Sequence, residues 1–274
     1  MLVRGVGCMR IIDFHTHIYP PAVAAKATES ICQFYELSGA GMEGTAEALI
    51  QRGKTAGISQ FVVLPVAMKP DRVRHINAFI AEEVAAHKEF FGFGSLHAQM
   101  ENACEEVSWI AESGLKGIKM HPDFQKFDID DIRLYPAYDR MRSLGLPVLF
   151  HMGDTRYDYS HPLRLRRLMD QFPGLQVIAA HFGGYSMYET AYEYLKDTDC
   201  LLDISSSLMF MEEKTALQYI RRYGAERLVF GSDYPLWNPE QELERFLNLG
   251  LEPEEMEQIA WKTACRILKI DEDA

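Results

Sequence analysis

Short apolar runs recur along the chain at a spacing of roughly 25–32 residues, the size of one strand–helix unit in a parallel α/β fold. After a first run at about residues 11–18, further runs begin near residues 61, 90, 115, 147, 175, 200 and 227. Most are continuously apolar rather than alternating, as expected for parallel strands buried on both faces. Eight such strands in a chain of 274 residues favour a closed barrel over an open sheet. We therefore predict an α/β fold with one (β/α)8 TIM barrel.

The segments between these runs carry helical patterns with recognisable boundaries. The predicted strands are residues 11–18, 61–66, 90–96, 117–121, 148–151, 177–181, 201–204 and 228–230, and helical patterns cover, for example, 73–87, 132–144, 163–172 and 214–223. Gly145 follows one of these helices, and Pro253 begins the last one. Two further patterns, at 23–35 and 45–56, predict an extra helical segment between the first two strands. No linker rich in Pro, Ser or Gly divides residues 1–274, so we predict a single domain with an N-terminal extension over residues 1–10.

Composition excludes several classes of partner. The formal net charge is −12 and no Lys/Arg-rich run interrupts it, so a nucleic-acid partner is not expected. No stretch approaches the roughly 20 apolar residues that span a bilayer, so no membrane partner is expected. The five cysteines are scattered and form no Cys-x-x-Cys pair, which indicates free thiols in a reducing cytoplasm. We predict a cytoplasmic protein that acts on a small molecule; a homodimer is possible, although no sequence feature indicates an interface.

Side chains with metal-binding or acid–base chemistry stand at the carboxyl ends of five predicted strands. In barrels of this kind the catalytic groups gather at these ends. A lone histidine there is often only a hydrogen-bonded residue, and a lone aspartate often begins the next helix. Several in register favour a shared site, because imidazole and carboxylate ligands hold a metal that activates water. These side chains are His15 and His17, Lys119 and His121, His151, His181, and Asp233.

The same motifs, in the same order, resemble those of the amidohydrolase superfamily. They are His15-Thr16-His17, Gly117-Ile118-Lys119-Met120-His121-Pro122, His151, His181-Phe182-Gly183-Gly184 and Gly231-Ser232-Asp233-Tyr234-Pro235. More narrowly, the pattern resembles the amidohydrolase-related (amidohydrolase-2) branch, the group that contains aminocarboxymuconate-semialdehyde decarboxylase-like proteins. The resemblance covers about residues 11–270. It is specific for the superfamily and says little about the substrate.

The resemblance implies a metal centre. It implies ligation by His15, His17, His151 and Asp233 of one divalent cation, with zinc expected first and manganese or iron as alternatives. Asp233 would also handle the proton of the metal-bound water, and His181 would be the second catalytic residue, as an acid/base or oxyanion-polarising group.

Lys119, His121 and Arg156 are the predicted substrate-binding residues. In binuclear superfamily members a lysine at the fourth strand is carboxylated and bridges two metals, which would add a second metal at Lys119. The narrower branch implies one metal and a lysine that serves the substrate, which we favour. His121 shares the inward face with Lys119, and a position at the edge of the site is the alternative. Arg156 follows the fifth strand and could pair with a substrate carboxylate, or it could be a solvent-exposed loop residue.

Two reactions suit this set of residues. The first expectation is a metal-dependent hydrolase that acts on a small cyclic amide, lactone or carboxylated ring compound through a metal-activated water. The alternative is a non-oxidative decarboxylase (carboxy-lyase) of an aromatic or unsaturated carboxylic acid at the same site. A barrel that kept the ligands but lost activity is a third reading, disfavoured by the intact set. The residues do not choose between hydrolysis and decarboxylation.

Overall fold

The computed structural model describes residues 9–37 and 40–272. Most of the expected N-terminal extension therefore lies outside the described residues. The elements follow in the order β1 (Ile12–Thr16), α1 (Pro21–Phe34), α2 (Ala46–Ala56), β2 (Gln60–Val63), η1 (Pro70–Arg72), α3 (Val73–Ala86), β3 (Phe90–Gly92), β4 (Gly94–Ser95), α4 (Ala103–Glu112), β5 (Ile118–Met120), α5 (Pro122–Gln125), η2 (Ile132–Leu134), α6 (Tyr135–Leu144), β6 (Val148–Phe150), α7 (Pro162–Gln171), β7 (Val177–Ala179), η3 (His181–Gly183), α8 (Tyr188–Leu195), β8 (Leu201–Asp203), α9 (Glu213–Tyr223), η4 (Ala225–Arg227), β9 (Leu228–Val229), α10 (Pro239–Leu247), α11 (Pro253–Glu257), η5 (Gln258–Lys262) and α12 (Thr263–Leu268).

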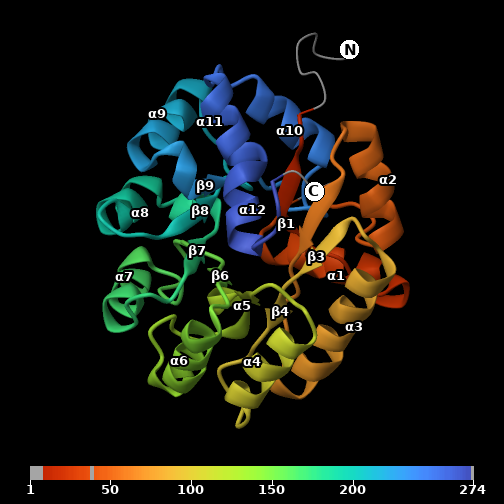
Figure 1. Ribbon diagram of the computed structural model, residues 1–274, viewed down its shortest axis with the longest axis vertical. Helices are drawn as coiled ribbons and strands as arrows, with labels where there is room; N and C mark the ends of the chain where they lie inside the picture. The colour runs from red at the N-terminus through yellow and green to blue at the C-terminus, as the bar shows by residue number, and fades with distance from the viewer. Residues whose placement is uncertain (1–8, 38–39, 273–274) are drawn as a thin grey trace.

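The strands form a closed parallel barrel (Figure 1). They pair in two runs, β1-β2-β3 and β4-β5-β6-β7-β8-β9. The predicted strand 90–96 is interrupted at Phe93, whose N–H donates to Val63 O at 3.0 Å, and so appears as β3 and β4. The last strand returns to the first: Phe14 N–H donates to Phe230 O, and Asp233 N–H donates to His15 O, both at 2.8 Å. With β3 and β4 counted as one strand, this is the predicted (β/α)8 barrel, and the predicted fourth, fifth, sixth and eighth strands are β5, β6, β7 and β9.

Side chains alternate between two apolar layers along each strand. In β2, Phe61 and Val63 belong to the layer packed under the surrounding helices, whereas Val62 belongs to the cluster that fills the barrel. The barrel cluster also contains Leu149 of β6 and Ile178 of β7. Both layers are almost fully buried, which is why the strands read as continuous apolar runs.

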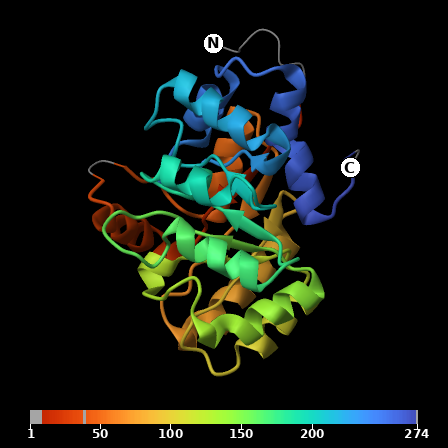
Figure 2. The ribbon, with the colours of Figure 1, turned by 90° about the vertical axis from the view of Figure 1, so that its left-hand side faces the viewer.

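Two helices at opposite ends of the barrel define its polarity. Four residues of α12, from Ala264 to Leu268, pack against the interior cluster and close one end. Helix α1 lies at the other end, and the two views show α1 and α12 on opposite sides of the strands (Figure 2). In the order of the chain, both α1 and α2 come between β1 and β2. The last helix, predicted as one element beginning at Pro253, contains a π-helical stretch at Gln258–Lys262.

Local signals explain most helix boundaries. Thr45 caps α2 by accepting the Ala48 N–H, and Gly145 ends α6 in the left-handed conformation with φ of 62°. The predicted pattern at 132–144 splits into η2 and α6, because Pro136 begins a new helix at its first turn. Within the described ranges, no helix is both long and apolar enough to cross a membrane.

Candidate metal centre and active site

A cavity of about 320 Å³ opens at the carboxyl ends of the strands. Its floor is polar and carries all seven side chains that the sequence placed at strand ends: His15, His17, Lys119, His121, His151, His181 and Asp233. Its walls are largely apolar or aromatic and come from α1 and from the loops after β2 and β9, among them Ile31, Phe34, Val66, Leu236 and Trp237. The strand-end pattern in the sequence thus corresponds to one enclosed site.

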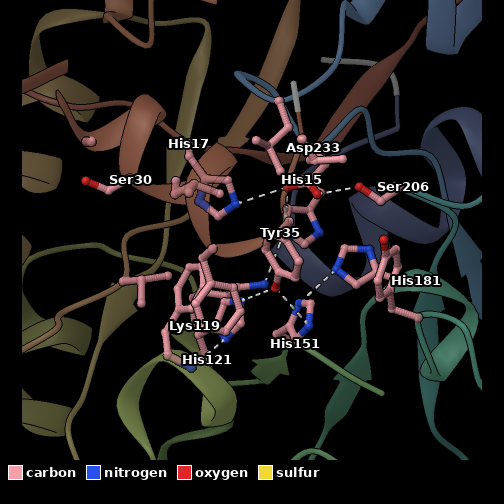
Figure 3. Close-up of a pocket in the computed structure, with 18 of the residues that line it drawn as sticks. His15, His17, Ser30, Tyr35, Lys119, His121, His151, His181, Ser206 and Asp233 are labelled. Atoms are coloured by element: carbon pink, nitrogen blue, oxygen red, sulfur yellow. Dashed lines mark hydrogen bonds and ion pairs between the residues drawn. The ribbon is translucent and has the colours of Figure 1, made fainter. Parts of the chain in front are cut away.

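Three donor atoms converge on one side of the floor (Figure 3). Asp233 Oδ1 lies 3.5 Å from His15 Nε2 and 3.3 Å from His17 Nε2. All three ligand atoms lie within 4.8 Å of one another. The first and last strands supply them, so barrel closure assembles the cluster.

The segment after β9 passes close to β1 at Gly231. A Cβ on Gly231 would lie 2.7 Å from His15 Cβ, so a larger residue would separate β9 from β1. Asp13 Oδ1 accepts the N–H groups of His15, at 3.3 Å, and Ser232, at 2.8 Å, and so links the two strands directly. Asp233 itself has a φ of 61°, a left-handed conformation that aims its carboxylate at the two imidazoles.

The outer nitrogens of both histidines are tied to acceptors. His15 Nδ1 lies 2.8 Å from Asp203 Oδ2, and His17 Nδ1 lies 2.5 Å from Leu64 O. Since a carboxylate and a carbonyl only accept, each neutral ring carries its proton on Nδ1 and presents the Nε2 lone pair to the cavity. Two lone pairs and a carboxylate oxygen then face one another without a proton between them. This donor set suits a divalent cation.

The protonation states agree with that role. Burial, with help from Lys119, lowers the pKa of His15 to about 4. Burial alone would raise the pKa of Asp233, but His15 and His17 hold it well below its usual value. At neutral pH the cluster therefore consists of a neutral imidazole, His15, beside an ionised carboxylate.

Lys119 rises from β5 beside this cluster. Its Nζ lies 3.2 Å from His15 Nε2, and its side chain is buried. Burial lowers the pKa of Lys119 to about 8, against the opposing pull of Asp203 and Asp233. Among the described residues that line the cavity, Lys119 is the one Lys or Arg. It is well placed to meet an anionic group on a bound molecule.

A second group of histidines occupies the other side of the floor. His151 Nδ1 lies 3.0 Å from His181 Nε2, and the His151 ring stacks on His121 with ring centroids 3.9 Å apart. The Tyr35 hydroxyl lies 3.1 Å from His121 Nε2 and 3.2 Å from His151 Nε2. His151 does not join the three-donor cluster and lies instead with His121 and Asp123. Its ligation of the metal stays a prediction.

Arg156 lies in a different place from the one expected of a residue that pairs with a substrate carboxylate. It does not line the cavity. Its Nε and Nη2 donate to the buried carboxylate of Asp154 at 3.0 and 2.7 Å, and its Nη1 donates to Phe34 O at 2.6 Å. The guanidinium is thus engaged by the chain itself, and its contact with substrate stays a prediction.

Sequence reasoning missed three residues of the site: Tyr35, Asp203 and Ser205. Ser205 Oγ lies 3.0 Å from both His15 Nδ1 and His181 Nδ1. A carboxylate at the end of a strand, as Asp203 is in β8, was a usable signal. Tyr35 carried none, because its helix lies between the first two strands and only folding brings it over the floor.

A family model described as Amidohydrolase matches residues 12–270. The chain belongs to the amidohydrolase family. This confirms the resemblance seen in the motifs, including the amidohydrolase-2 branch.

One sequence relative and two solved structures illustrate what this chain is similar to. The chain is 24% identical over 252 residues to gamma-resorcylate decarboxylase of a Polaromonas species, a match that covers 73% of this chain and 77% of the relative. An uncharacterized TIM-barrel protein from Bordetella bronchiseptica superposes with a TM-score of 0.80 at 23% identity, over 95% of this chain and 99% of that one. 5-Carboxyvanillate decarboxylase from Novosphingobium aromaticivorans, in complex with manganese and 4-hydroxy-3-methoxy-5-nitrobenzoic acid, superposes with a TM-score of 0.77 at 16% identity, over 96% of each chain. At these identities the two structures show a shared fold.

Proposed function

We propose that this amidohydrolase-family protein is a metal-dependent, non-oxidative decarboxylase of an aromatic or unsaturated carboxylic acid. The observation that carries the proposal is the division of the cavity into a floor with the His15, His17 and Asp233 donor cluster beside one lysine, and walls that are apolar and aromatic. An aromatic acid fits such a space with its carboxylate on the floor and its ring against the walls. The decarboxylase names of relatives support this alternative better than the hydrolase that the sequence put first.

The residues of the floor have distinct parts in this reaction. A divalent cation held by His15, His17 and Asp233 would supply positive charge that polarises the oxygens of the substrate. The Lys119 ammonium pairs with the carboxylate and orients it. The apolar walls exclude water from a carboxylate that becomes neutral carbon dioxide when it leaves.

The reaction breaks the bond between the ring carbon and the carboxylate carbon, and its electron pair stays on the ring carbon. A proton then forms the new C–H bond as carbon dioxide departs. We propose Asp233 and His181 as the groups that hold and return this proton, because both side chains border the cavity floor. His121 lies on the floor of the same cavity and remains a proposed substrate contact.

The identity of the metal, the number of metal ions and the cellular compartment are also proposed. Manganese replaces zinc as our first choice, because the decarboxylase from Novosphingobium was solved with manganese. One metal is favoured, since Lys119 contacts His15 directly rather than bridging two donor clusters. The four cysteines of the described ranges are free, which suits a reducing cytoplasm. The homodimer also stays a prediction.

The decisive experiment measures whether deuterium or 18O from labelled water enters the product. Protein loaded with manganese is incubated in D2O with 2,6-dihydroxybenzoate, and separately in 18O-labelled water with a panel of lactones and cyclic amides. Decarboxylation releases carbon dioxide and leaves one deuterium on the ring carbon that carried the carboxylate, as seen by NMR and mass spectrometry. Hydrolysis instead adds one 18O to the product.

Three controls make the result specific. Chelated protein and Asp233→Asn should be inactive, and Asp170→Asn, which alters an exposed partner of Arg166, should match the wild type. Incorporation of 18O without release of carbon dioxide across a broad set of hydroxybenzoates would restore the hydrolase. Neither product from any compound would contradict both.

A further inference from the structure

Helix α1 turns one of its faces toward the cavity. Four residues of α1, and the residue that follows it, line the cavity at intervals of three and four positions: Ala27, Ser30, Ile31, Phe34 and Tyr35. This is the spacing of one helical face. Helix α1 and helix α12 lie on opposite sides of the strands, so α1 stands at the end where the cavity opens (Figure 2). A molecule that rests on the cavity floor therefore meets this face of α1 above it.

This face of α1 offers a bound ring mainly hydrocarbon. Three of its five side chains are apolar. The two polar side chains are engaged by the chain itself: Ser30 Oγ donates to Lys26 O at 2.8 Å, and the Tyr35 hydroxyl contacts the rings of His121 and His151 (Figure 3). A polar group of a ligand that pointed at the apolar side chains would lose water without gaining a hydrogen bond, which is unfavourable.

Phe34 is fixed in this face from two sides. Arg156 Nη1 donates to Phe34 O at 2.6 Å, and its guanidinium carbon lies 4.5 Å from the centroid of the Phe34 ring. The Phe124 ring meets the Phe34 ring at 90°, with centroids 4.5 Å apart. Asp154 holds the guanidinium in turn through two hydrogen bonds. The Phe34 ring therefore has little room to retreat from a bound ligand.

A second stripe of α1 seats the helix on the chain that follows it. Gly41 has a φ of 92°, and a Cβ there would lie 2.6 Å from Thr28 Cγ2 and 2.9 Å from Cys32 Sγ. The helix thus packs directly against the backbone at Gly41. Met42 N–H donates to Pro235 O at 2.8 Å, which ties this segment to the loop after β9. Together with Arg156, these contacts make α1 a fixed wall of the cavity.

The direction of the bound ring decides which of its edges meets α1. The proposed function places the carboxylate on the floor beside Lys119. Because an aromatic ring is planar and rigid, the edge opposite the carboxylate then points away from the strand ends and toward α1. Tyr19 and Tyr185 also line the cavity, but they belong to the loops after β1 and β7 and not to this face.

We propose that α1 selects the substrate, and that Ile31 and Phe34 are specificity-determining residues. They favour an aromatic acid whose ring edge opposite the carboxylate carries hydrogen or a small alkyl group rather than a hydroxyl or a second carboxylate. The inference rests on the proposed function, which sets the direction of the ring. It narrows the substrate from aromatic acids in general to those with an apolar far edge.

The first test compares 2-hydroxy-4-methylbenzoate with 2,4-dihydroxybenzoate. The two acids differ only at the far edge, where a methyl group replaces a hydroxyl of similar size. Calorimetric titration of the manganese-loaded protein gives Kd, and KM is used for an acid that is turned over; kcat is not compared, because the substituent also changes the reactivity of the ring. We expect the methyl compound to bind about 5–100-fold more tightly, the usual effect of burying one unpaired hydroxyl. Equal or tighter binding of the dihydroxy acid would overturn the proposal.

The second test changes the wall instead of the ligand. Ile31→Asn places an amide in the cavity face of α1, and the preference for the methyl compound should fall about fivefold or more. Val23→Asn is the matched control, because Val23 is on the same helix, is 48% exposed and does not line the cavity. Its preference should stay within about twofold of the wild type.

Phe34→Leu provides a variant of a different kind, should Ile31→Asn fail to fold. The smaller side chain shortens the wall, so 2-hydroxy-4-propylbenzoate should gain about fivefold or more in affinity relative to the 4-methyl acid. An unchanged ratio in Phe34→Leu, together with an unchanged preference in Ile31→Asn, would show that α1 does not select the ring and would overturn the proposal.

Further outcomes separate this inference from the proposed function. The expected preference without any decarboxylation would support the inference and contradict the reaction. Decarboxylation without the preference would do the reverse. Lys119→Met should weaken both acids alike. If both acids instead bound normally to Lys119→Met and were lost from Arg156→Met, the carboxylate would lie at Arg156, the ring would be reversed, and the inference would fail. Binding of neither acid by the wild type would overturn both the inference and the proposed function.

Discussion

The two sides of the cavity floor hold histidines in opposite ways. His15 and His17 turn their protons outward, to Asp203 and Leu64 O, and leave two lone pairs facing the Asp233 carboxylate. On the other side, Tyr35 lies between His121 Nε2 and His151 Nε2, and His151 Nδ1 contacts His181 Nε2. The first side directs two ring nitrogens and a carboxylate oxygen at one another, whereas the second joins its rings to one another and to Tyr35. The partners of each ring nitrogen therefore distinguish the two sides, and ligation of a metal by His151 stays a prediction.

Asp233→Asn should have the largest effect on this contrast. It removes the negative charge of the donor cluster and a proposed proton carrier together, so metal binding should fail and turnover should fall about 10³-fold or more. Calorimetric titration with manganese and a rate assay measure the two effects. Tight manganese binding by the variant would show that the cation is held elsewhere, with the His121, Asp123 and His151 group as the next candidate.

Asp203→Asn should have the next largest effect, because Asp203 holds the ring of His15 through the nitrogen that points away from the donor cluster. The carboxylate accepts from His15 Nδ1 through one oxygen and from the N–H groups of His181 and Ser205 through the other, so an amide must place its NH2 against a donor. Loss of such a partner typically weakens metal binding about 10–100-fold. Manganese affinity is the measurement. An unchanged affinity would mean that the His15 tautomer does not depend on Asp203.

Lys119 stands between the two sides and should make the reaction sensitive to pH. Its lowered pKa of about 8 means that the ammonium loses its proton as the pH rises through that value. If the charge binds the carboxylate, kcat/KM should be level below pH 8 and fall about tenfold per unit well above it. A pH profile of the wild type is compared with Lys119→Arg, whose charge persists, so the fall should disappear in the variant. The same fall in both proteins would assign the titration to another group.

Ser205→Ala should have the smallest effect, although Ser205 touches both sides. His15 Nδ1 keeps its bond to Asp203 Oδ2 at 2.8 Å, and His181 Nδ1 keeps the carbonyl of residue 205 at 3.0 Å. We expect less than about a threefold change in kcat and a loss of about 0.5–1.5 kcal/mol in the free energy of unfolding, the usual contribution of one hydrogen bond. Chemical denaturation and the rate assay measure both. A change of tenfold or more in kcat would show that the two sides are coupled through this hydroxyl.

The sequence predicted the parts of the molecule whose signals are local. Continuous apolar runs predicted the strands and the barrel, because burial on both faces leaves that mark in each strand separately. The same runs predicted the cavity-lining residues His15, His151, His181 and Asp233, since each stands at or near the carboxyl end of its strand. The interruption at Phe93 was not visible, because it depends on pairing with β2 and β5 rather than on the run itself.

Residues that act across the barrel could not be predicted in this way. Tyr35 and Arg156 meet only after α1 folds over the strand ends, and nothing in either segment reveals the contact. Arg156 was predicted either to pair with a substrate carboxylate or to be a solvent-exposed loop residue; it pairs with Asp154, two residues earlier, and its contact with substrate stays a prediction. The contacts of Tyr35 with His121 and His151 likewise form only in the folded chain.

The three converging donors come from the first and last strands of the barrel. During synthesis, His15 and His17 leave the ribosome early, whereas Asp233 follows only when β9 has been made. A nascent chain that stops before β9 lacks the carboxylate that completes the cluster. Because a ligand that binds only the native state stabilises it, binding of the cation would stabilise only barrels that have closed. Metal occupancy would therefore distinguish finished molecules from truncated ones inside the cell.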